Sequence, residues 1–91
     1  MNVPKRVIYL RKYLVEKYTV AFIDMEYVVY RDFGDGRDVE ISCMPYRKKA
    51  NVYFWLDKTR IIRRAFNVPY DKVAEIVERF RGETEAEHER T

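Results

Sequence analysis

Four carboxylates are the first candidates for a reactive or metal-binding site in this chain. Asp24 and Glu26 alternate along one predicted strand, and Asp38 and Glu40 alternate along the next. Residues two apart share a face of a strand, so all four side chains are expected to face the same way. Clustered carboxylates can bind a hard divalent cation or hold a raised pKa for general acid catalysis. The solvated face of an antiparallel sheet shows the same pattern, and a metal-dependent nuclease using Asp24, Glu26 and Glu40 therefore ranks third among our hypotheses.

Other reactive side chains are few. The chain has one cysteine, Cys43, which the strand pattern places in the core, and one histidine, His88. Neither a Cys-His nucleophile pair nor a structural zinc site can be assembled from these two within one chain. The glycines Gly34 and Gly36 are explained by a hairpin turn rather than by a phosphate-binding loop. We therefore predict that the protein is not an enzyme, and that it has no catalytic residue, no bound metal ion and no cofactor.

Basic residues provide the second kind of candidate site. They fall into three groups, at residues 5–17, 47–49 and 58–64, with tyrosines among them. Lys and Arg neutralise phosphates and release counterions, and aromatic rings stack on bases. This favours a small nucleic-acid-binding or regulatory module for DNA or RNA over basic faces that are merely solvated. The expected contacts are Arg47, Lys48, Lys49, Arg60, Arg63, Arg64 and Tyr46.

Composition limits the class of protein. The chain has 91 residues, a net charge of +3 and 47% hydrophobic residues, which suits one folded domain. We expect that domain at residues 1–81, followed by an acidic disordered tail at 82–91 that has four Glu and little to bury. No apolar run approaches the roughly 18 residues of a membrane span. The single cysteine and the absence of a secretory pattern after Met1 favour the cytoplasm.

Hydrophobic periodicity predicts an α+β fold. Apolar residues at steps of three and four indicate an N-terminal helix, and alternation with period two follows from Thr19. The glycine-rich segment 32–37 is the strongest turn signal, and a hairpin around it would place Val39 beside Val29. We predict a three-stranded antiparallel sheet with the helix and a C-terminal helix pair packed on one face. The elements are expected at residues 4–18 (helix), 19–30, 38–43 and 51–56 (strands), and 59–66 and 70–81 (helices).

Helices on one face leave the other sheet face open. In the expected register this face carries Phe22, Val28, Tyr30, Tyr53 and Trp55. Such a surface is more apolar than a small monomer normally exposes. The alternative function is therefore a protein-interaction or structural module that homodimerises through these five side chains.

Residues 60–76 have a regular apolar spacing around a central turn. The apolar positions are Ile62, Phe66, Val68, Val73 and Ile76, with Asn67 at the turn. With this spacing the segment resembles a helix-turn-helix motif, and the resemblance implies two packed helices that bind DNA. The segment departs from the motif at Arg63, where a small residue is usual, and in the second helix, where Asp71, Glu75 and Glu78 would repel phosphates.

Overall fold

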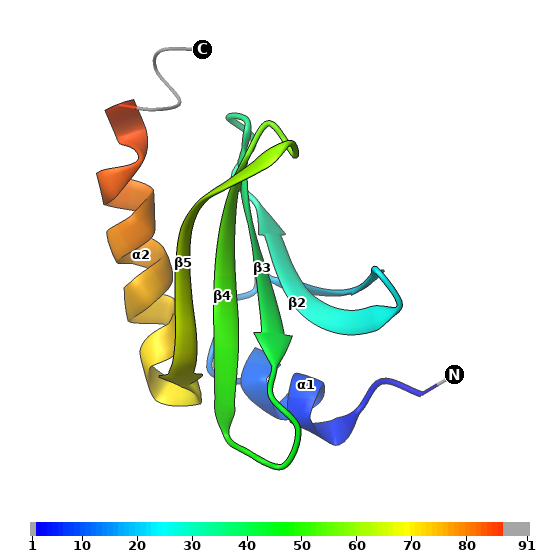
Figure 1. The fold of residues 1–91 in the computed structure, drawn as a ribbon. Coiled ribbons are helices and arrows are strands. Elements are labelled where there is room, and N and C mark those ends of the chain that lie inside the picture. Colours follow the sequence, from blue (N-terminus) through cyan, green and yellow to red (C-terminus); the bar gives the residue numbers. More distant parts are fainter. Residues whose placement is uncertain (1, 87–91) are drawn as a thin grey trace.

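Five antiparallel strands form one sheet in the order of the chain, with one helix before them and one after (Figure 1). This computed structural model describes residues 2–86. The predicted three-stranded sheet with a C-terminal helix pair is wrong. No helix within residues 2–86 is long and apolar enough to cross a membrane. The elements are α1 (Lys5–Arg11), β1 (Thr19–Ile23), β2 (Glu26–Asp32), β3 (Arg37–Cys43), β4 (Lys49–Leu56), β5 (Arg60–Pro69), the 3-10 turn η1 (Tyr70–Lys72) and α2 (Val73–Glu83).

A two-residue turn divides the predicted strand 19–30 into β1 and β2. Asp24 and Met25 both have positive φ, at 51° and 68°, as the commonest hairpin turns require. The turn reverses the chain without a glycine, so the apolar alternation in the sequence hides it. It also changes which residues face the helices. Phe22 pairs with Tyr27 and lies on the helix side, whereas Val28 lies on the opposite face.

The predicted helix at 59–66 is the strand β5. Its two adjacent isoleucines and Phe66 favour a strand, and pairing with β4 satisfies its backbone. The pairing with β4 shifts register twice, and Asn67 has φ 57°. These irregularities interrupt the two-residue period and leave a spacing that also suits a helix. Because no helix precedes α2 at this position, the resemblance to a helix-turn-helix does not correspond to the fold.

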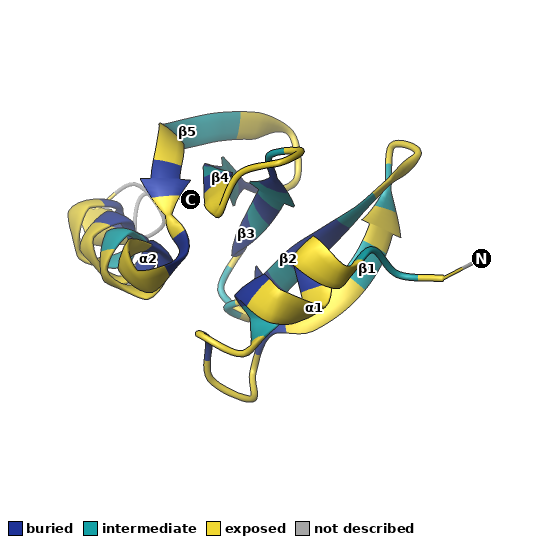
Figure 2. Cartoon of the chain, turned by 90° about the horizontal axis from the view of Figure 1, so that it is seen from below, coloured by how far each residue is buried: buried dark blue, intermediate teal, exposed yellow. Residues whose placement is uncertain are grey.

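The core lies between one face of the sheet and both helices. α1 contacts β1, β2 and β3, and α2 contacts β4 and β5. Burial is greatest in the central strands and least in the edge strand β1 (Figure 2). Val29 pairs with Ile41 rather than with Val39, so the predicted β2–β3 register is wrong by two residues although its faces are right. Cys43 is buried in this core, as predicted.

A buried arginine joins the β2–β3 turn to the end of α2. Arg37 is 2% exposed, and its guanidinium donates to the Asp35 carboxylate at 2.6 Å. It also donates to the Arg81 carbonyl at 2.7 Å and to the Thr84 hydroxyl at 2.9 Å. α2 therefore continues through Gly82, where the sequence predicts its end, and Thr84 is buried. Residues 87–91 of the predicted tail lie outside the described residues.

Replacing Met25 by glycine should stabilise the protein. Met25 is 86% exposed, so little packing is lost. Glycine removes the strain of the left-handed conformation, which is about 1–2 kcal/mol. This gain exceeds the entropic cost of ordering glycine on folding, which is about 0.5–1 kcal/mol. We expect the free energy of unfolding in urea to rise by about 0.5–1 kcal/mol. Met25→Ala keeps the Cβ atom at the same φ and should give no gain; equal stabilisation by both variants would show that the methionine side chain is responsible.

Replacing Arg37 by methionine should destabilise the protein strongly. The variant keeps the apolar stem but removes the guanidinium that pairs with the Asp35 carboxylate and donates to the Arg81 carbonyl and the Thr84 hydroxyl. We expect a loss of about 3–5 kcal/mol in the free energy of unfolding, measured by Trp fluorescence in urea. Arg79→Met is the matched control, because Arg79 is exposed and makes only surface contacts, an ion pair with Glu83 at 3.7 Å and a cation–π contact with the Phe80 ring. That control should change stability by less than about 0.5 kcal/mol, and similar losses for the two variants would contradict the role of Arg37.

Candidate functional site

The first turns of α1 and the β3–β4 loop meet at one end of the sheet. The Met44 N–H donates to the Lys49 carbonyl at 2.9 Å and closes this loop. Tyr70 holds the loop from the other side, since its N–H donates to the Lys48 carbonyl at 3.2 Å. Between them is a hollow of about 410 Å³, here called the tyrosine–basic hollow, in which every lining residue is a tyrosine or a cation. It is lined by Lys5, Arg6, Tyr9, Tyr46, Arg47, Lys48 and Tyr70.

The tyrosines of this hollow form a small cluster. The Tyr9 ring meets the rings of Tyr13 and Tyr70 edge to face, with centroids 5.6 and 5.9 Å away. The ammonium of Lys48 stands 5.2 Å from the centre of the Tyr9 ring, within cation–π distance. A hydrogen bond from Tyr13, followed by the positive charge of Lys48, lowers the pKa of Tyr9. Tyr46 is fully exposed and has φ 60°, so its ring is presented to solvent.

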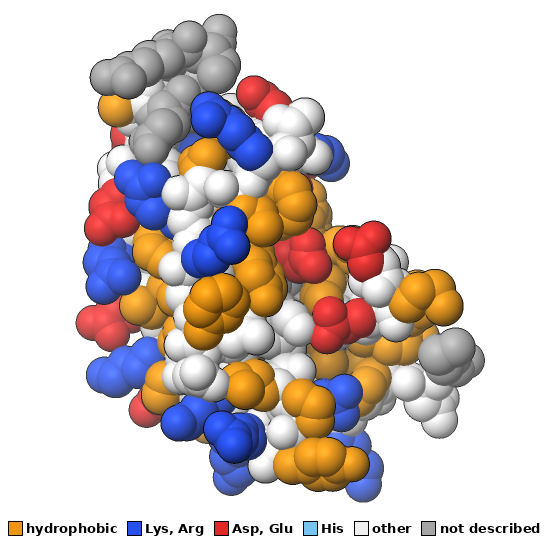
Figure 3. Space-filling model, viewed as in Figure 1, with side chains coloured by type: hydrophobic (Ala, Val, Ile, Leu, Met, Phe, Trp, Pro, Cys, Tyr) orange, Lys and Arg blue, Asp and Glu red, His pale blue; other side chains and the backbone are white. Residues whose placement is uncertain are grey.

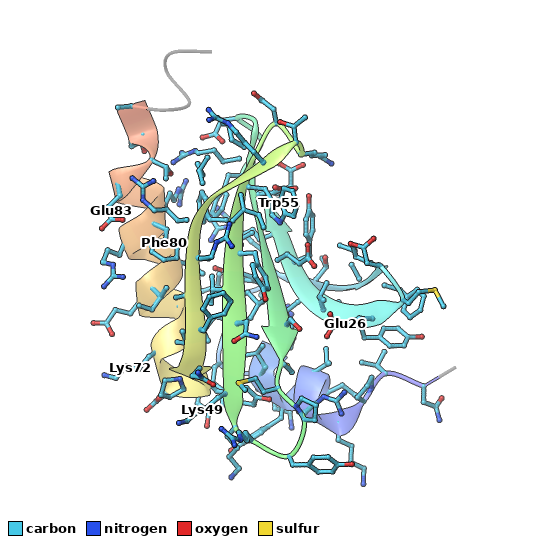
Figure 4. The ribbon with its side chains drawn as sticks, viewed as in Figure 1. Glu26, Lys49, Trp55, Lys72, Phe80 and Glu83 are labelled. Carbon is cyan, nitrogen blue, oxygen red and sulfur yellow. The ribbon has the colours of Figure 1, made fainter. Side chains whose placement is uncertain are left out.

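The structure brings together only part of the predicted nucleic-acid site. Tyr46, Arg47 and Lys48 lie in the β3–β4 loop, and Lys49 begins β4 beside it. Arg60 begins β5 opposite Leu56, about 23 Å along the sheet from Lys49 at 3.3 Å per residue. Figure 4 shows this separation, with Lys49 and Trp55 towards opposite ends of β4.

Two further predicted contacts lie elsewhere on β5. Arg63 donates to the Glu83 carboxylate at 3.3 Å, which directs it towards α2. Arg64 pairs with Tyr53 on the face that no helix covers. In Figure 3 the blue side chains at the bottom of the view gather around the loop end, away from those higher on β5. The predicted set of six cations is therefore divided among four places: the loop end, the start of β5 and the two faces of β5.

Four residues of the hollow were missing from the predicted site. Lys5, Arg6 and Tyr9 lie on the exposed side of α1, and their basic helical spacing is visible in the sequence. Their approach to the β3–β4 loop is a tertiary contact between segments about 40 residues apart in the chain. Tyr70 belongs to η1, a turn that the sequence pattern merges with the following helix.

The uncovered sheet face is narrower than the predicted interface. Phe22 lies on the opposite face and contacts the Tyr27 ring at 4.8 Å, and Val28 is fully buried within the monomer. Tyr30, Tyr53 and Trp55 remain partly accessible on the open face. Homodimerisation through that face stays a prediction.

Three of the four predicted carboxylates lie beside these aromatic rings. Asp24, Asp38 and Glu40 border a second hollow of about 420 Å³, here called the carboxylate hollow, whereas Glu26 is not among its lining residues. Figure 3 shows acidic side chains to the right of centre on the open face, and Figure 4 shows Trp55 and Glu26 standing on it. Among residues 2–86, no three His, Cys, Asp or Glu side chains are close enough together to hold a metal ion. The hollow is lined by Ala21, Ile23, Asp24, Tyr30, Asp38, Glu40, Trp55 and Lys58.

The carboxylates of this hollow are only partly compensated by neighbouring groups. Tyr30 donates its hydroxyl proton to Asp38 Oδ2 at 2.5 Å. The other carboxylate oxygen of Asp38, Oδ1, is buried without a hydrogen-bond partner. Burial raises the pKa of the Glu40 carboxyl, and the neighbouring carboxylates of Asp24 and Glu26 raise it further. The hollow therefore concentrates negative charge that nearby protein groups do not fully compensate.

Glu40→Gln should stabilise the protein at neutral pH. A folded pKa above the unfolded value means that stability from Glu40 is present in acid and is lost as pH rises through the folded pKa. The variant should thus be more stable than the wild type at pH 7, and the difference should vanish below about pH 4, where Glu40 is protonated in both states. Urea unfolding at both pH values measures this. Glu16→Gln, in the exposed α1–β1 loop, is the control, and a gain that persists unchanged in acid would contradict the electrostatic cause.

Comparison with known proteins finds no relative of this chain. No model of a known protein family matches the chain, and no curated protein or solved structure is significantly similar to it. The function proposed below is therefore argued from the chain's own residues.

Proposed function

We propose that the chain binds single-stranded nucleic acid, DNA or RNA, through the tyrosine–basic hollow. The observation that carries this proposal is the lining of that hollow, in which four cations surround three tyrosines. Proteins that bind single strands combine a positive surface for the phosphates with aromatic rings on which bases stack.

The cations come from two elements and point to one surface. Lys5 and Arg6 begin α1, and Arg47 and Lys48 lie in the β3–β4 loop. All four side chains are exposed, so none of them is held in a buried ion pair within the described residues. Each phosphate that such a group neutralises releases condensed counterions, which makes binding stronger at low salt.

Tyr46 supplies the stacking surface. A fully exposed tyrosine at positive φ is unfavourable for both side chain and backbone, and no packing in the free protein offsets this. A base stacked on the ring would bury it. Tyr9 and Tyr70 form the floor behind it, and the cation–π contact of Lys48 with Tyr9 holds a positive charge above that floor.

Removing the loop cations should weaken nucleic-acid binding and its salt dependence together. For Arg47→Gln with Lys48→Gln we expect the slope of log affinity against log salt to fall by about 1.4, at about 0.7 per phosphate contact of a single strand. Tyr46→Ala should weaken binding by the loss of one stacked base, about 1–3 kcal/mol, and Tyr46→Phe should not. The measurement is fluorescence anisotropy of labelled single-stranded oligonucleotides over a salt series.

The matched control is Arg60→Gln with Arg64→Gln, which removes the same charge from β5. These residues lie outside the hollow, so affinity and slope should change much less. Equal effects of the two double variants would show binding to be governed by net charge alone. Binding that is absent at low salt, or insensitive to salt, would overturn the proposal.

A further inference from the structure

The carboxylate hollow has a chemistry opposite to that of the tyrosine–basic hollow. Three carboxylates line it, those of Asp24, Asp38 and Glu40, against the single cation Lys58. Lys58 lies in the exposed β4–β5 turn, and it makes no ion pair with them in the described part of the chain. The side chains that line the hollow therefore carry more negative than positive charge.

The hydrogen bonding of the Asp38 carboxylate indicates which donor groups a positively charged ligand must have. Its side chain is 6% exposed, and only Oδ2 has a donor, the Tyr30 hydroxyl. Oδ1 has none, although buried carboxylate oxygens in proteins are normally hydrogen-bonded. A ligand with N–H groups could supply the missing donor after a small rotation of the carboxylate. A quaternary ammonium ion, which has no N–H, could not.

The other walls of the hollow favour an organic cation over an inorganic one. The described carboxylates are too dispersed to coordinate a metal ion. Ala21 and Ile23 provide apolar surface for an alkyl chain, and the rings of Tyr30 and Trp55 are adjacent. Aromatic faces attract desolvated ammonium groups. The volume of about 420 Å³ falls in the range of small-molecule sites.

We propose that the carboxylate hollow binds a primary alkylammonium group, with Asp38, Asp24 and Glu40 as its acceptors and Trp55 beside its alkyl chain. Lys58 competes with this ligand, because its positive charge lies at the same rim. Two sources share the required chemistry: a free diamine or polyamine, and the side chain of a lysine residue on another protein.

The only tryptophan of the chain lines this hollow, so its fluorescence reports on occupancy directly. The titration uses the whole chain at low ionic strength with 1,4-diaminobutane, spermidine, and N-acetyl-lysine methylamide as the lysine source. Tetramethylammonium, 1,4-butanediol and Mg²⁺ are the comparison ligands. We expect at least one of the three amines to bind with a dissociation constant of about 1 mM or below, and each comparison ligand to bind at least about tenfold more weakly. Which amine binds best identifies the source.

Variants test the assigned residues. Asp38→Asn should weaken amine binding about tenfold or more, since one acceptor charge is lost from a buried position. Asp24→Asn serves as a second variant, because asparagine tolerates the left-handed turn conformation and the fold is kept. It should weaken binding several-fold, and Lys58→Gln should strengthen it several-fold. Asp71→Asn removes an exposed carboxylate outside the hollow and should leave affinity unchanged.

The proposal fails if the amines cause no change in Trp55 fluorescence up to about 50 mM, well beyond the range of specific small-ligand affinities. It also fails if tetramethylammonium binds as well as the amines, or if Asp24→Asn and Asp71→Asn weaken binding equally. The last two results would indicate a diffuse attraction to negative charge in place of a site.

Discussion

The alternation of side chains across one antiparallel sheet is the constraint on which this structure depends. Each strand sends every second residue to either face, and both helices pack against the same face. The core therefore takes one half of the strand residues, and the other half, apart from the buried Val28, is polar or partly exposed. A turn that shifts the alternation by one residue moves every side chain of the adjoining strand to the opposite face of the sheet. The turn at Asp24 and Met25 has this effect on β1.

The two ends of the sheet are organised differently. At the end with the β2–β3 turn, the buried guanidinium of Arg37 fastens the turn to the last residues of α2. Removing a buried charge partner is costly, so this end has little freedom to vary. At the other end the β3–β4 loop is held mainly by backbone hydrogen bonds to Lys49 and Tyr70, and its charged side chains are free to meet a ligand. Binding residues are typically loop side chains that a rigid scaffold holds at the surface.

The protein thus separates two surfaces of opposite charge. The tyrosine–basic hollow lies at the loop end, and the carboxylate hollow lies on the open face near the other end of β4. Their separation along β4 is roughly 20 Å at 3.3 Å per residue, about two and a half times the screening length of about 8 Å at physiological salt. Each proposed ligand would therefore experience little of the charge of the other hollow. The carboxylates would also repel a phosphate backbone that strayed onto the open face, which would confine a nucleic acid to the loop end.

Three features could be predicted from the amino-acid sequence alone: the period-two alternation around Asp38 and Glu40, the turn at Gly34 and Gly36, and the burial of Cys43. Local composition suffices for these because each depends on neighbouring residues only. It did not determine the turn at Asp24 and Met25, where left-handed residues other than glycine leave no signal, or the strand at 60–69, where pairing with β4 overrides a helical spacing. The approach of α1 to the β3–β4 loop, and the gathering of Ala21, Asp38 and Trp55 around one hollow, join residues far apart in the chain. Only tertiary structure decides such contacts, because they follow from how the strands pair and which face the helices cover.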